Sequence, residues 1–557
     1  MTYFVLLMTS LLVLAGLRWC FVPHSRVPRF RVRYLRARLH LKLHPGRGHA
    51  TVAELWLRWG RLAAFRRSRR SRWSLTAWQR LCRPALHSLL LGRAHYRHCL
   101  RVPVEEHVLI MAPPRTGKTG LLARIVMHYP GPVVSTTTKH DVFELTSGVR
   151  CSLGPVQVFN PQRIGGVAST FRWNPVAGCE DPATAIRRAD SFANAVSMSG
   201  TEDASFWSSK ASSYLRALFH AAALTGGDMR LVTQWALGSA EPAEDRLARA
   251  GAGQWALELA ELRGDAQKTA QTIRMVISRA LAFMTDPALA QSVLTDGGDG
   301  NFDIEAFLRH RGTLYMIAES GYDDSPVAPL FAAMAGEIHH VATQLGQDTP
   351  GGRLDPPLLM ALDEIVQTCP VPLPTWLADS GGKGIQLIPV AHGEAQLRTR
   401  WGKDGAQVVL DTCGVKVWLP GITDTATLKM ASELCGQASF REPGHERGRD
   451  YRVWHDVITP DMIRQLPGRY ALIVRTSHAP VIARLGTAWK DRAHRLARRI
   501  AATITPPTRG LPRPALAGLP PAGPAIWPRQ PPPAWPDLDF EAGGERRGDD
   551  FPPNPWS

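Results

Sequence analysis

The segment 111–120, MAPPRTGKTG, constrains the fold of this 557-residue chain more than any other. It follows the apolar run HVLIM (107–111), and its Gly117, Lys118 and Thr119 open the helical pattern GLLARIVMHY. A buried strand, a loop and a helix that begins at Gly-Lys-Thr form a P-loop, in which backbone N–H groups and the helix N-terminus hold phosphates. The sequence therefore predicts a nucleotide site in an α/β fold.

The first position of this loop departs from the usual pattern, because Ala112 stands where the pattern has glycine. If that position needs a positive φ, alanine costs on the order of 1 to 2 kcal/mol, and otherwise alanine fits without strain. Pro113 and Pro114 remove two N–H donors, but they precede the donors expected at the β-phosphate. Lys118 is predicted to reach the β- and γ-phosphates and Thr119 to bind Mg²⁺. The predicted ATP-binding residues are Ala112, Pro113, Pro114, Arg115, Thr116, Gly117, Lys118, Thr119 and Gly120.

A second motif supplies the acids that such a site requires. The run LLMALDEI (358–365) places Asp363 and Glu364 directly after a predicted buried strand. An acid at that position holds Mg²⁺ opposite the P-loop threonine, and the acid beside it can act as general base toward the attacking water. The alternative is a surface turn at a strand end. We predict that Asp363 and Thr119 hold the metal and that Glu364 and Lys118 are catalytic.

Other continuous apolar runs with turn signals at their ends predict further strands. Continuous runs indicate strands buried on both faces, as in a parallel sheet covered by helices. Between about 182 and 300 the pattern is helical instead, so we predict an all-helical domain inserted into the α/β domain (102–181 and 301–500). The predicted strand runs are 107–114, 132–139, 156–161, 312–319, 358–365, 384–391, 414–421 and 468–476.

The formal net charge of +18 is confined to the N-terminal region. From Arg18 to Arg101 there are 21 basic residues and one acid, Glu54, whereas the rest is nearly neutral. The apolar stretch that begins YFVLLMTSLLVLAGL precedes this basic run. We predict a single transmembrane anchor at 1–22, a basic cytoplasmic juxtamembrane segment at 23–101 and the bulk of the chain in the cytoplasm, since positive residues stay inside. A buried core helix is the alternative for residues 1–22.

Two further compositional features concern the C-terminal region and the cysteines. From 506 to 557, 15 of the residues are proline, which predicts a disordered tail. The eight cysteines are scattered without a paired metal spacing, which suits a reducing compartment and argues against a zinc site.

A co-linear series of motifs between Leu109 and Trp489 resembles the TraG/TraD family of type IV secretion coupling proteins, and the segment 49–70 resembles actinobacterial-type members of that family. The series is more specific than either nucleotide motif alone. Besides the P-loop and LLMALDEI, it comprises 132–146, 158–162, 171–179, 312–320, 325–338, 374–405, 411–421 and 458–475.

The resemblance implies a RecA-like motor domain, an inserted all-α domain, a membrane anchor and assembly as a homo-hexamer. It implies ATP-driven conjugative DNA transfer, with single-stranded DNA and a relaxase brought to type IV secretion channel proteins at the inner or plasma membrane. It places Lys118 and Thr119 in the P-loop and Asp363 and Glu364 in the acidic pair. Alternatives are an FtsK-like double-strand DNA translocase and an ATP-binding recruitment scaffold.

Three positions depart from the family pattern, and the first is Ala112 in the P-loop. Gly382 stands where the family usually has an arginine, and His392 stands where it has a glutamine that would sense the γ-phosphate. A histidine can also donate a hydrogen bond, so we predict His392 as a catalytic residue, with a strand-end histidine of no role as the alternative. In QLRTRWGKDG, Arg398, Arg400 and Lys403 are candidates for DNA contact or for a solvated helix face.

Overall fold

The structure is a computed structural model, and it describes residues 48–94, 98–197, 203–264, 267–294, 301–319, 325–443 and 450–504. The predicted anchor at 1–22 and the predicted tail at 506–557 lie outside these residues. Within the described ranges, no helix has the length and apolar character needed to cross a membrane.

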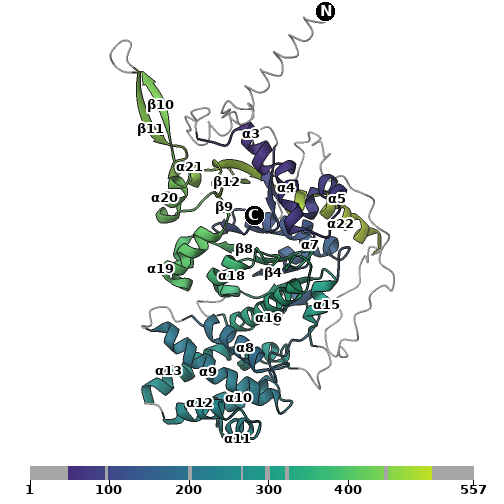
Figure 1. The fold of residues 1–557 in the computed structure, drawn as a ribbon, viewed down its shortest axis with the longest axis vertical. Helices are drawn as coiled ribbons and strands as arrows, with labels where there is room; N and C mark the ends of the chain where they lie inside the picture. Colours follow the sequence, from purple (N-terminus) through teal and green to yellow (C-terminus); the bar gives the residue numbers. More distant parts are fainter. Residues whose placement is uncertain are drawn as a thin grey trace, which may run out of the picture.

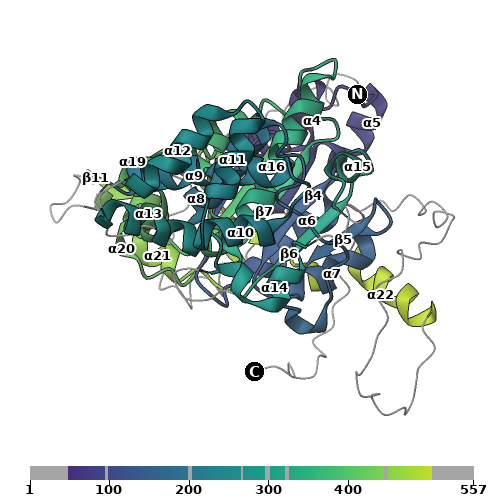
Figure 2. The same cartoon turned by 90° about the horizontal axis from the view of Figure 1, so that it is seen from below.

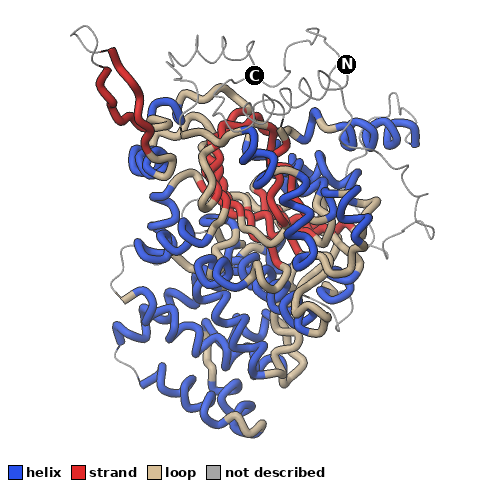
Figure 3. The backbone as a smooth tube through the Cα atoms, turned by 45° about the horizontal axis from the view of Figure 1, so that its top comes forward, coloured by secondary structure: helices blue, strands red, loops and turns tan. Residues whose placement is uncertain are grey.

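An eleven-stranded sheet forms the centre of the described structure (Figure 3). Its spatial order is β2-β1-β13-β12-β9-β3-β8-β7-β4-β6-β5. From β9 to β5 all neighbouring strands pair in parallel, whereas β12, β13, β1 and β2 pair antiparallel. A separate hairpin, β10–β11, projects from one end (Figure 1). The strands are β1 (Ser88–Arg93), β2 (Cys99–Pro103), β3 (Val108–Met111), β4 (Val133–Thr137), β5 (Val156–Phe159), β6 (Thr313–Ile317), β7 (Leu358–Leu362), β8 (Ile385–Ala391), β9 (Val415–Trp418), β10 (Gln437–Pro443), β11 (Asp450–Asp456), β12 (Tyr470–Arg475) and β13 (Val481–Leu485).

Helices cover both faces of this sheet and form the region beside it. Around the sheet they are α3 (Val52–Glu54), η1 (Leu55–Trp59), α4 (Arg61–Ser71), α5 (Ala77–Cys82), η2 (Pro84–Leu86), α6 (Lys118–His128), α7 (Asp141–Arg150), η4 (Ile164–Gly166), α15 (Ile304–Arg309), α16 (Ala328–Gln347), α17 (Ile365–Thr368), α18 (Leu373–Asp379), α19 (Glu394–Thr412), α20 (Thr425–Glu433), α21 (Pro460–Arg464), η6 (Ala488–Lys490) and α22 (Arg492–Ile504). The region between β5 and β6 comprises α8 (Pro182–Ala195), α9 (Ala204–Ala223), α10 (Met229–Leu237), α11 (Glu241–Arg249), α12 (Gly253–Gly264), α13 (Gln267–Ala280), η5 (Ala282–Thr285) and α14 (Pro287–Gln291).

Strand β3 shows why continuous apolar runs form the centre of the sheet. All of its residues are buried, and successive side chains point to opposite faces. Val108 and Ile110 join an apolar cluster that contains Leu121 and Leu122 of α6. The alternate residues join a second cluster, which contains side chains from α16 and the helical region. Both faces are therefore covered, as a parallel sheet requires.

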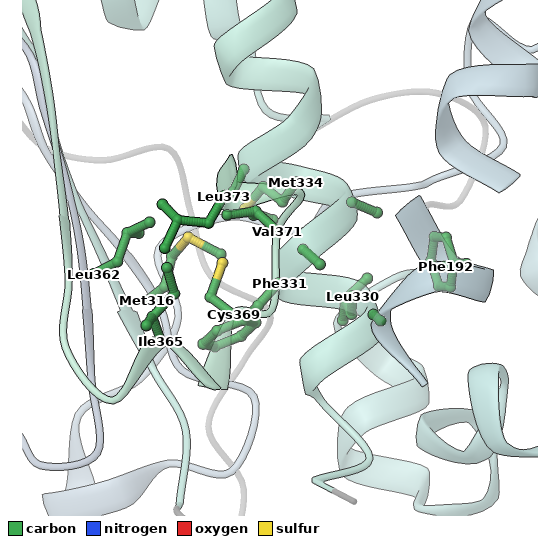
Figure 4. Close-up of a cluster of buried hydrophobic side chains, with 14 of the residues drawn as sticks. Phe192, Met316, Leu330, Phe331, Met334, Leu362, Ile365, Cys369, Val371 and Leu373 are labelled. Carbon is green, nitrogen blue, oxygen red and sulfur yellow. The ribbon is translucent and has the colours of Figure 1, made fainter. Parts of the chain in front are cut away.

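Helix α16 joins the sheet to the helical region. Its Phe331 and Met334 are fully buried. Figure 4 shows these side chains with Met316 of β6 on the side of the sheet and Phe192 of α8 on the other. The helices α8 to α13 accordingly lie together below the sheet in Figure 1 and in front of it in Figure 2. The described residues of 182–300 are helical without a sheet strand, as the pattern predicts.

Two details of the sheet differ from the sequence-based expectation. The run 468–476 forms β12, but β12 pairs antiparallel with β9, so the sheet is parallel only in part. Strand β1 lies within 23–101 and β2 begins there, so the sheet extends into the predicted juxtamembrane segment. That segment also packs against the domain, because the indole of Trp59 is fully buried and the guanidinium of Arg475 lies 5.1 Å from its ring centre.

Candidate nucleotide site

The loop between β3 and α6 has the backbone of a phosphate-binding loop. Gly117 adopts φ +96° immediately before α6, a left-handed conformation that favours glycine. A Cβ at Gly117 would meet no atom within 4 Å, so conformation rather than space requires the glycine. The hydroxyl of Thr116 donates to the carbonyl oxygen of Pro113 at 2.7 Å and closes the turn.

Ala112 fits the first position without strain. It is fully buried and is not among the described residues with a positive φ. Its N–H donates to the carbonyl oxygen of Ala391 at 3.0 Å, which continues the pairing of β3 with β8. The missing glycine therefore imposes no conformational cost on this loop.

The start of α6 offers unused donors toward this loop. The first N–H groups of a helix have no acceptor within it, and they point toward its N-terminal end. Leu121 donates to the carbonyl oxygen of Gly117, but the N–H groups of Lys118, Thr119 and Gly120 have no acceptor among the described residues. This cluster of donors fits a phosphate group, and prolines 113 and 114 do not interrupt it.

The acidic pair faces the P-loop lysine. Asp363 and Glu364 follow β7, which is separated from β3 only by β8. Lys118 Nζ lies 2.7 Å from Glu364 Oε1 and 3.4 Å from Asp363 Oδ1. The three side chains are 11%, 17% and 5% exposed respectively, so they form a nearly buried charge cluster. The predicted halves of the site, 240-odd residues apart in sequence, therefore meet at the carboxyl edge of the sheet.

Local structure holds the acids in place. Burial raises the pKa of Asp363, and the charge of Lys118 opposes that shift. The carbonyl oxygen of Asp363 accepts hydrogen bonds from Thr136 Oγ1 at 3.1 Å and from Thr368 Oγ1 at 2.9 Å. Glu364 adopts φ +50°, a conformation that costs a non-glycine residue on the order of 1–3 kcal/mol. The two threonine bonds fix the strained turn that aims Glu364 at Lys118. Sequence reasoning did not identify these threonines, although Thr136 stands at the end of a predicted strand.

The chemistry of this cluster fits Mg²⁺ with a nucleotide. Asp363 is a buried hard oxygen donor, and Thr119 is the second residue of α6 beside Lys118. Mg²⁺ is typically bound by one or two protein oxygens together with substrate phosphates. A metal ion held there would stabilise the charged form of Asp363, which burial disfavours.

His392 lies against the loop, as the prediction requires. Its Nδ1 is 3.0 Å from the carbonyl oxygen of Ala112, and its N–H donates to Gln396 Oε1 at 2.9 Å. Since a carbonyl oxygen only accepts, Nδ1 carries the proton, and Nε2 of the neutral ring is then an acceptor. A neutral His392 therefore cannot donate to a phosphate through Nε2; only the protonated ring can.

Two of the three basic residues predicted as candidates for DNA contact have partners elsewhere. Arg398 pairs with Glu394 on its own helix, and Arg400 donates to the carbonyl oxygens of Asn194 and Val196 at the end of α8. Arg400 thus ties α19 to the helical region. Gly382 precedes β8, at the strand end opposite to the P-loop.

Together, the largely parallel sheet, the loop that opens α6 and the facing acids form a RecA-like P-loop fold with a helical region. Residues 357–468, which include Asp363, Glu364 and His392, match the family described as "TraM recognition site of TraD and TraG". The match covers about a fifth of the chain, and over this segment the chain is similar to the TraG/TraD family.

Solved structures share the fold. The bacterial conjugative coupling protein TrwB in an unbound form is 18% identical with a TM-score of 0.54, over 72% of this chain and 90% of that one. TrwB with the GTP analogue GDPNP is 19% identical with a TM-score of 0.52, over 71% and 90%. TrwB with ADP and Mg²⁺ is 18% identical with a TM-score of 0.50, over 70% and 88%. No curated protein sequence matches the chain.

Proposed function

We propose that this chain is an ATP-driven coupling protein for conjugative DNA transfer. The observation that carries the proposal is the contact of Lys118 with the acids Asp363 and Glu364 beside a P-loop that offers free N–H groups. The match of residues 357–468 to the recognition site of TraD and TraG supports the coupling role, and so does the TrwB fold with its nucleotide complexes.

Each side chain of the site has its own role in the hydrolysis of ATP. Lys118 binds the β- and γ-phosphates and offsets the charge that develops on the γ-phosphate. Asp363 and Thr119 would hold Mg²⁺, which would neutralise phosphate charge. Glu364 accepts a proton from the attacking water, and its carboxylate is then the general base.

The contact between Lys118 and Glu364 links binding to catalysis. In the described structure the ammonium of Lys118 donates a hydrogen bond to Oε1 of Glu364 at 2.7 Å. When Lys118 turns to the phosphates, that oxygen becomes free to accept a proton from water. Nucleotide binding would thereby activate the base.

The resemblance to the TraG/TraD family supports a proposal for the wider assembly. The protein acts at the inner or plasma membrane through the anchor at 1–22, with its bulk in the cytoplasm. It forms a homo-hexameric ring that moves single-stranded DNA and delivers a relaxase to type IV secretion channel proteins. Recognition of the relaxase–DNA complex involves residues 357–468, whose family name describes binding of TraM.

The test is DNA transfer by cells whose only copy carries Lys118→Ala. ATP turnover and transfer should both be lost, because the ammonium that faces the acidic pair is absent. Lys429→Ala, which removes an exposed lysine on α20, is the matched control and should transfer normally. Normal transfer by the Lys118 variant would contradict the motor function. Loss of transfer in the control would show that charge loss alone is harmful.

A further inference from the structure

A tryptophan outside the motifs covers the first turn of the P-loop helix. A Cβ built on Gly120 would lie 2.5 Å from Trp489 Cη2 and 3.0 Å from Cζ2 and Cζ3, so the six-membered ring of the indole rests directly on Gly120. Trp489 is nevertheless 46% exposed. Part of this residue therefore faces solvent beside the first turn of α6.

The segment that carries Trp489 is fixed to α6. Asp491 Oδ2 lies 2.9 Å from His128 Nε2 and 3.2 Å from Arg124 Nε, and both partners are on α6. Ala488 beside the tryptophan is fully buried. The short helix η6 is therefore held on α6 from both sides of Trp489, so the position of the indole does not depend on a ligand.

The direction in which a nucleotide would lie in the site brings its base toward this ring. The γ-phosphate end is marked by Lys118, Asp363 and Glu364, and β7 lies on one side of β3 in the sheet order. Trp489 follows β13, which lies on the other side of β3. Backbone N–H groups of a P-loop hold the α- and β-phosphates, and that of Gly120 is the last free donor before the helix bonds to itself. Ribose and base extend from the α-phosphate, beyond Gly120.

We propose that Trp489 is the stacking platform for the base of the bound nucleotide, an inference that rests on the proposed ATP site. An indole offers a flat surface to any base, and stacking of this kind tolerates different bases. The platform accordingly adds affinity for nucleosides and contributes little to the choice between ATP and GTP. Gly120 is required beneath it, since any side chain there would displace the ring.

The experiment compares ATP with a ligand that has phosphates but no base. Equilibrium binding of Mg-ATP and of Mg-tripolyphosphate is measured on the full chain and on Trp489→Ala, Trp489→Phe and Trp454→Ala. Trp454 is also an exposed tryptophan, 65% exposed on the separate hairpin, and serves as the control for the loss of an indole. Trp489→Ala should weaken ATP binding about tenfold and leave tripolyphosphate binding unchanged, because only the base touches the ring. Trp489→Phe should retain most of the ATP affinity, and Trp454→Ala should retain all of it.

Two results would overturn the inference while leaving the ATP site intact. One is unchanged ATP affinity in Trp489→Ala. The other is an equal loss for ATP and tripolyphosphate, which would mean that Trp489 only supports the loop. If the unmodified chain bound neither ligand, the proposed nucleotide site itself would be wrong, and the platform with it.

Discussion

Removing the ammonium of Lys118 should destabilise the nucleotide-free chain in a pH-dependent way. Lys118 is the nearest cation to Asp363, whose side chain is 5% exposed, and it also contacts Glu364 at 2.7 Å. Removing one partner of a buried pair costs on the order of 3–5 kcal/mol, because the remaining charge is left uncompensated. We expect about 3 kcal/mol for Lys118→Ala, since Glu364 is more exposed than Asp363.

The sign of the pH dependence follows from Asp363. Burial holds its pKa above the ordinary value of 3.8, so the folded state binds a proton more readily than the unfolded state. The variant lacks the cation that opposes this shift, so the pKa of Asp363 rises further. As pH falls through that raised pKa, Asp363 becomes neutral and the penalty disappears. The loss of stability should therefore be larger at about pH 8 than at about pH 5.

Unfolding of both proteins by urea at the two pH values measures this difference. Lys429→Ala is the control for loss of a lysine and should match the unmodified chain at both. An equal loss of stability at about pH 5 and about pH 8, or no loss at either, would refute the argument that Lys118 compensates a buried carboxylate.

Three further predictions concern the site and its support. Glu364→Gln keeps the size and an acceptor oxygen but removes the base, so ATP should bind normally while turnover falls by about 10²–10⁴-fold in a steady-state assay; unimpaired turnover would exclude Glu364 as the base. Ala112→Gly should lower the free energy of unfolding by about 0.5–1 kcal/mol without improving ATP affinity, because Ala112 already has a negative φ; tighter ATP binding would show that alanine strains the loop. Burial raises the pKa of Asp491, but the hydrogen bond and charge of His128 and the charge of Arg124 lower it to about 2. The ionised Asp491 should therefore contribute about 2 kcal/mol to the free energy of unfolding, complete above pH 3.8 and lost as pH falls through 2. Asp491→Asn should remove that contribution at neutral pH and have little effect near pH 2, as measured by urea unfolding, and an equal loss at both pH values would contradict the ion-pair origin.

The sequence predicted the centre of the fold well because buried parallel strands leave a strong local pattern. Each apolar run ending at an acid or a turn, such as that before Asp363, became a strand, and Gly117 with Lys118 opened the helix as expected. The pairing of Lys118 with Glu364 was also predictable, since parallel strands bring their carboxyl ends to one edge.

Other features depend on tertiary contacts that no local pattern records. The direction of β12 follows from its pairing with β13, and a continuous apolar run gives no information on direction. Strands β1 and β2 were hidden because their apolar runs are short and include arginines, of which Arg101 is buried in the folded chain. Trp489 lies 369 positions after Gly120 in sequence, and only the folded chain shows that the two are in contact. The proton on Nδ1 of His392 likewise follows from the carbonyl of Ala112, a neighbour that the sequence does not place.

Equilibrium binding of Mg-ATP to the full chain and to Lys118→Ala tests the central claim most directly. We expect the unmodified chain to bind Mg-ATP. Lys118→Ala should bind Mg-ATP at least about 100-fold more weakly, because this variant lacks the charge-assisted hydrogen bonds to the phosphates. Equal affinity in the two proteins, or no binding by the unmodified chain, would contradict the assignment of the loop at 112–120 and the acids at 363 and 364 as a nucleotide site.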